Sequence, residues 1–154
     1  MSGGIEWALP LFPGVESDME LSVRDPSQGE TSVLDSSEPF NVVVRWDIPS
    51  TVVGGLGGEF RIRVFAESIG PGQEKQIGTD TIVPVVALQD SYNKVIAIPA
   101  LSLLGEGNLD AVSGLPVSGI YKICAVLQHQ HGTFSQTQAC GYAEKDGMIQ
   151  MRAP

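Results

Sequence analysis

The chain has 154 residues, of which 42% are hydrophobic and 18% charged, with 18 glycines and 10 prolines. This length suits one domain, and the composition is typical of a globular protein with many turns. The formal net charge of −9 argues against nucleic acid and anionic membranes as partners, because binding phosphates requires clustered Lys and Arg.

The acidic residues are concentrated toward the N-terminus. Residues 1–39 carry eight Asp or Glu against one arginine, whereas residues 40–154 carry ten against eight Lys or Arg. Residues 1–18 mix glycine, proline and acids, and we expect them to form an irregular N-terminal segment ahead of a domain that spans residues 19–154. A first edge strand is predicted around Leu21.

From residue 40 onward, apolar side chains alternate with other side chains, which is the pattern of a half-buried strand. Glycine and proline separate the first run from the second, and similar runs follow along the rest of the chain. Short strands separated by turns predict an all-β fold, an antiparallel β-sandwich of about seven strands. The predicted runs cover residues 40–47, 60–67, 76–88, 93–101, 120–130, 134–143 and 148–152.

Two segments carry more specific patterns. The alternation that leads into Trp46, with a proline three residues later, is similar to the second strand of the fibronectin type III family, which holds a core tryptophan near its end. Leu115 precedes Tyr121 by six positions, as at the family's tyrosine corner, where the ring fills the core and the hydroxyl bonds upstream backbone. The resemblance covers about residues 21–143 and implies a fibronectin type III or immunoglobulin-like sandwich. Ile123 stands where immunoglobulin domains carry their second core cysteine, so that disulfide is not expected.

The sequence contains no clear catalytic or metal-binding motif. The spacing of His129 and His131 would let both rings share one face of a strand and bind a metal, but no further ligand lies nearby in the sequence. Two polar residues at a hairpin tip are the favoured interpretation. A nucleophile needs a base within hydrogen-bond reach, and the chain has no nucleophile-elbow motif. We therefore expect no enzymatic activity, no cofactor and no bound metal.

Cys124 and Cys140 flank the same predicted hairpin, and their relation depends on the length of its loop. A three-residue loop would make them direct cross-strand neighbours on the outward face. A two-residue loop would pair Cys124 with Ala139 and turn Cys140 to the other side. Two free thiols on adjacent strands are favoured.

Alternation also predicts which residues lie on the outer face of the sheet that the third, sixth and seventh predicted strands form. If the apolar positions point inward, the intervening side chains face outward. That face is both apolar and basic on an acidic protein, which is typical of a contact surface. The N-terminal segment, with Trp7, could instead fold back and cover it. The predicted interaction face contains Arg61, Arg63, Phe65, Lys122, Val126 and Tyr142.

The sequence thus predicts a non-catalytic module that binds another protein through this face. One alternative is a structural homo-oligomer, such as a homodimer, in which the same face meets its own copy. A carbohydrate-binding module is a weaker alternative, because the aromatic residues are scattered. The chain has neither a signal peptide nor an apolar span of about 18 residues, so we expect it to be cytoplasmic and without a membrane partner.

Overall fold

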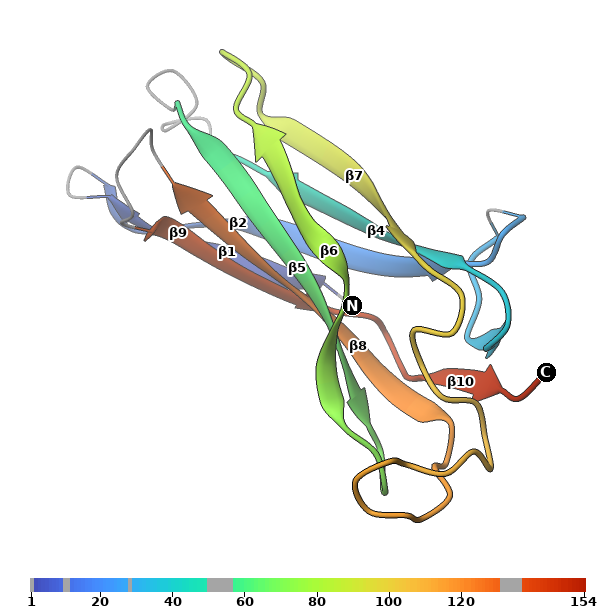
Figure 1. Ribbon diagram of the computed structural model, residues 1–154. Coiled ribbons are helices and arrows are strands. Elements are labelled where there is room, and N and C mark those ends of the chain that lie inside the picture. The colour runs from blue at the N-terminus through green and yellow to red at the C-terminus, as the bar shows by residue number, and fades with distance from the viewer. Residues whose placement is uncertain (1, 10–11, 28, 50–56, 131–136) are drawn as a thin grey trace.

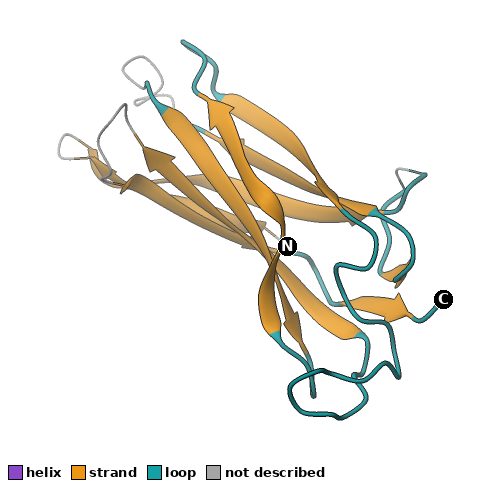
Figure 2. Cartoon of the chain, viewed as in Figure 1, coloured by secondary structure: helices purple, strands orange, loops and turns teal. Residues whose placement is uncertain are grey.

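The computed structural model describes residues 2–9, 12–27, 29–49, 57–130 and 137–154. These residues form strands, turns and loops and contain no helix, so none of them belongs to a helix that could cross a membrane (Figure 2). The strands are β1 (Ser2–Leu9), β2 (Phe12–Arg24), β3 (Val33–Asp35), β4 (Phe40–Asp47), β5 (Glu59–Ser68), β6 (Glu74–Pro84), β7 (Ser91–Ile98), β8 (Ile120–Gln130), β9 (Thr137–Glu144) and β10 (Ile149–Arg152).

All ten strands belong to one mixed sheet. Eight of them follow one another in the order β6-β5-β8-β9-β1-β2-β4-β7, and each neighbouring pair is antiparallel. β10 pairs with the start of β8, and the short β3 pairs with β10 in parallel. The all-β prediction is confirmed, although the sheet contains ten strands rather than about seven.

The sheet bends back on itself into a β-sandwich-like arrangement. In Figure 1, β5, β6 and β8 cross the front of the view, and β2 and β4 lie behind them. Trp46 on β4 and Phe60 on β5 meet across this fold with their ring centroids 5.3 Å apart. Tyr92, the neighbour of Trp46 on β7, stacks against it at 5.3 Å and also meets the Phe60 ring at 5.2 Å, so aromatic side chains join the two layers.

The predicted inward phase of the central strands is confirmed. Trp46 is 1% exposed and Tyr121 is 4% exposed. On β5 and β8 the buried positions alternate strictly with half-buried ones over most of the strand length. Alternation therefore identified the core positions of β5 and β8 correctly, whereas on β4 it missed Val43, which is also buried. The buried positions of these two strands are Phe60, Ile62, Val64, Ala66, Tyr121, Ile123, Ala125, Leu127 and His129.

The structure corrects the expectation that residues 1–18 are irregular. They contain β1 and the first half of β2, and β1 pairs with β9 on one side and β2 on the other. At Gly3 the backbone of β9 comes so close that a Cβ atom would overlap the carbonyl group of Tyr142. β1 therefore extends the sheet beyond β9 instead of covering its outer face. The side chains of residues 6–16, including Trp7, lie outside the part that the structure describes.

Gly141 on β9 pairs with Ile5 on β1. A Cβ atom at this position would lie 2.8 Å from Cγ1 of Ile5 and 2.9 Å from the sulfur of Met19. Both of those side chains are buried, at 1% and 0% exposure. The missing side chain thus leaves room for β1 and β2 to pack their core residues against β9.

Tyr121, the tyrosine of the predicted corner, lies at the start of β8, just after the connection from β7. The hydroxyl of Tyr121 donates a hydrogen bond to the carbonyl oxygen of Leu104 at 2.8 Å, so it does bond upstream backbone. Leu115, the other half of the sequence resemblance, is 53% exposed and is not a core residue. Val117 is buried in this connection instead, at 3% exposure.

Candidate functional site

The structure brings all six residues of the predicted interaction face onto one side of the sheet. Arg61, Arg63 and Phe65 follow one another at alternate positions of β5 and are half-buried. Val126 on β8 lies between Arg63 on β5 and Tyr142 on β9, so these three form one row across the strands. Lys122 lies nearer the start of β8. We call this surface the outer face of β5, β8 and β9; its role in binding stays a prediction.

Four of the six residues line a depression of about 310 Å³ in the middle of the outer face. This volume is at the small end for ligand sites and suits a few side chains better than a cofactor. Cys124 and Val126 are half-buried next to Phe65, and together they provide apolar surface. The depression is lined by Phe65, Glu67, Glu74, Lys122, Cys124, Val126 and Tyr142.

A polar network surrounds one side of the depression. The ammonium nitrogen of Lys122 lies 3.2 Å from Oε1 of Glu144, and the hydroxyl of Tyr142 donates to the same oxygen at 3.0 Å. The Lys122–Glu144 contact raises the pKa of the lysine and lowers the pKa of the carboxyl group. Burial raises the pKa values of the Cys124 thiol and the Tyr142 hydroxyl. At neutral pH the thiol is therefore protonated, which suits a packing role better than a nucleophilic one.

The structure corrects the prediction that the outer face is basic. The Arg63 guanidinium Nε lies 3.0 Å from Oδ2 of Asp80, and the Gln76 amide donates to the other oxygen of Asp80 at 2.6 Å. A register irregularity between β5 and β6 brings Asp80 to this position. Lys122 is paired with Glu144 in the same way. Two of the three predicted basic residues are thus neutralised by carboxylates from β6 and β9, which strand alternation alone does not predict.

The two cysteines occupy the outer face in a register that neither predicted loop length gives. Cys124 pairs with Glu144, and Cys140 pairs with Gln128. Both thiols therefore lie on the same side but four positions apart, about 13 Å along the strands. That separation is too large for a disulfide between them. Both cysteines are free.

His129 is a core residue, and the interpretation as a polar tip residue is wrong. Its ring is fully buried and packs against Phe60, with 5.3 Å between the ring centroids. Its Nε2 atom lies 2.7 Å from the carbonyl oxygen of Gly57. His131 lies outside the described residues. Within the described ranges, no three His, Cys, Asp or Glu side chains come together in a way that could hold a metal.

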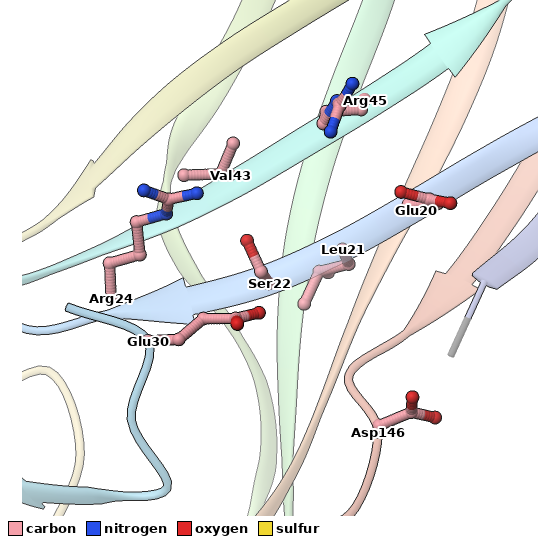
Figure 3. A pocket seen from close by; sticks show the side chains of 8 residues that line it. All are labelled: Glu20, Leu21, Ser22, Arg24, Glu30, Val43, Arg45 and Asp146. Carbon is pink, nitrogen blue, oxygen red and sulfur yellow. The ribbon is translucent and has the colours of Figure 1, made fainter. Parts of the chain in front are cut away.

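A second depression, of about 480 Å³, lies on the outer side of β2 and β4 (Figure 3). Arg24 and Ser22 come from β2, and Val43 and Arg45 come from β4. Its charges are of both signs and close to balanced, so they favour no particular class of ligand. The acidic residues that line it are Glu20, Glu30 and Asp146.

Comparison with known proteins adds no functional assignment. No protein-family model and no curated protein matches this sequence. Among solved structures, the chain is similar to a β-glucosidase from Listeria innocua in complex with glucose, with a TM-score of 0.44 and 15% identity. That match covers 91% of this chain but only 18% of the β-glucosidase chain. AggA, the major subunit of aggregative adherence fimbriae type I from Escherichia coli, matches with a TM-score of 0.38 and 9% identity, over 83% of this chain and 94% of that one.

Both similarities are too weak to support an argument about activity, substrate or assembly. The fold is that of an all-β, β-sandwich-like protein, and an apolar depression lies on an outer face of its sheet.

Proposed function

We propose that this protein is a non-catalytic module that binds a protein partner through the outer face of β5, β8 and β9. The observation that carries the proposal is the apolar depression beside Phe65 and Val126. A solvated sheet face normally carries polar side chains, whereas a contact surface combines an apolar centre with a polar rim. The rim is present here as the network of Lys122, Tyr142 and Glu144.

We further propose that the fold is of the fibronectin type III kind. The buried Trp46 near the end of β4 supports this assignment, as does the bond from Tyr121 to upstream backbone. β2, β4 and β7 would form one layer, and β6, β5, β8 and β9 the other, with β1 connecting the two. The separation of the free cysteines fits a reducing compartment such as the cytoplasm.

The absence of catalysis is part of the same proposal. His129 is held in the core against Phe60 and the Gly57 carbonyl group, where it is inaccessible to a substrate. A base must reach the proton that it abstracts, so burial argues against this role.

Site-specific photocrosslinking tests the proposed binding face. A photoreactive phenylalanine analogue would replace Tyr142, which is 43% exposed on the outer face. The matched control carries the analogue at Val95, which is 52% exposed on β7 in the other layer. After irradiation in an extract of the source cells, we expect covalent protein adducts at position 142 and none at position 95. Equal yields at both positions, or no adduct at position 142, would contradict the proposal.

A further inference from the structure

We infer that the partner of the outer face is a second copy of this chain, packed face to face across a two-fold axis. The inference rests on the proposed function and names the partner for the same site. It follows from the order in which charged and apolar residues occur along the strands.

The outer face is polarised from one end to the other. Its first row contains Arg61 on β5, and the next contains Arg63. Phe65 comes third, and Glu67, which pairs with Glu74 on β6, comes last. On the adjacent β8 the same rows contain Gln128, Val126, Cys124 and Lys122. The face thus has Arg61 and the Asp80-paired Arg63 toward one end, apolar side chains in the middle, and Glu67 and Glu74 beside Lys122 at the other end.

A two-fold interface requires a surface that is complementary to itself when its direction is reversed. We place the two-fold axis in the interface, parallel to the sheet and perpendicular to its strands, above the point of β5 between Arg63 and Phe65. Rotation about this axis reverses the order of the rows in the second copy. It places Arg61 over Glu67 of the second copy, and by symmetry this contact occurs twice.

The same rotation matches the central rows. Arg63 lies over Phe65 of the second copy, where its guanidinium group can contact the ring face. On β8, Val126 lies over Cys124 of the second copy, so the apolar centres meet. Glu59, at the start of β5, falls outside the overlap. Along β5 and β8 the order of charged and apolar side chains is therefore complementary to its own reverse.

The size of the face sets the expected strength of the dimer. Four rows span about 20 Å along the strands, and the four strands β6, β5, β8 and β9 span roughly 19 Å across them. This overlap is small compared with stable dimer interfaces, and each copy carries a net charge of −9. We therefore expect a dimer that dissociates on dilution, with a dissociation constant on the order of micromolar or weaker.

Charge reversal with sedimentation equilibrium tests this arrangement. We expect Arg61→Glu and Glu67→Arg each to weaken self-association at least about tenfold, because either change opposes like charges at two places. An equimolar mixture of the two variants should associate again as a heterodimer, because both cross-contacts then join opposite charges. Arg45→Glu and Glu20→Arg, on the outer side of β4 and β2, make the same charge changes and should leave wild-type association unchanged.

Two results would overturn the inference. One is a wild-type chain that stays monomeric up to about millimolar concentration, and the other is a mixture of the two variants that stays monomeric. Recovery in the mixture also shows that neither variant is misfolded. If the photocrosslink at Tyr142 captures a different protein while the wild type stays monomeric, the proposed binding face stands and the two-fold dimer fails. If no crosslink forms and no dimer is found, both fail.

Discussion

Replacing Trp46 by alanine should be among the most destabilising single changes in this protein. The side chain is 1% exposed, stacks on Tyr92 at 5.3 Å and meets the edge of Phe60 at 5.3 Å. Replacing a buried aromatic residue by alanine costs about 3 to 5 kcal/mol. The value should fall in the upper half of this range, because two aromatic contacts are lost together, and the one with Phe60 joins the two layers. Such a loss is comparable with the whole stability of a marginal domain, about 5 kcal/mol.

Urea denaturation followed by circular dichroism measures this effect without relying on tryptophan fluorescence. With a slope of about 2 kcal/mol per molar urea, Trp46→Ala should lower the midpoint by roughly 2 M. Among the described residues, the Trp46 indole nitrogen has no hydrogen-bond partner, so Trp46→Phe should cost clearly less than alanine. Arg45→Ala, at an exposed position of the same strand, is the control and should change stability by less than about 0.5 kcal/mol. Equal midpoints for Trp46→Ala and Arg45→Ala would refute the assignment of this core.

Three further changes test other parts of the fold. Gly141→Ala places a methyl group against buried side chains and should lower the free energy of unfolding, measured by urea denaturation, by about 1 to 3 kcal/mol. An unchanged midpoint would contradict the packing described for β9. Tyr121→Phe removes the hydrogen bond to the Leu104 carbonyl oxygen and should lower the free energy of unfolding by about 1 kcal/mol. An unchanged free energy of unfolding would show that water replaces this hydrogen bond. The Asp110 carboxylate accepts a hydrogen bond from the Ser113 backbone N–H at 2.7 Å, which lowers the pKa of Asp110 below 3.8. The stabilising effect of the ionised Asp110 carboxylate is present above pH 3.8 and is lost as the pH falls through the lowered pKa. The difference in thermal midpoint between wild type and Asp110→Asn should therefore close below about pH 3.8. A constant difference from pH 7 to pH 2 would contradict this.

Strand phase could be predicted from the sequence where one side of a strand is apolar. The runs that contain Trp46, Phe60 and Tyr121 alternate clearly, and their core positions follow from that alternation. The six residues of the predicted face fell on one side for the same reason, since β5, β8 and β9 share the period of two.

Features that depend on partners distant in the sequence could not be predicted. β1 is held by pairing with β9 at the other end of the chain, and its glycines and acids give no alternating pattern. Histidine is a polar residue type, so the sequence does not mark His129 as a core residue. Only its packing against Phe60 shows that it belongs to the core. The prediction that the outer face is basic was wrong for a similar reason, because the neutralisation of Arg63 depends on where β6 places Asp80.

The relative position of the two cysteines depends on the register of β8 against β9. A shift in register moves every pair along the ladder, and the loop length that sets it cannot be fixed from composition. The observed pairing of Cys140 with Gln128 follows from contacts along the whole hairpin and from the β1 strand on its other side.

Amide chemical shifts over a dilution series test the central claim most directly, that the outer face of β5, β8 and β9 is where two copies meet. Between about 500 µM and about 20 µM protein, we expect shift changes at residues 61–67 of β5 and residues 122–128 of β8, with β4 and β7 unchanged. Shift changes concentrated on β4 and β7, or spectra that do not change on dilution, would contradict that claim.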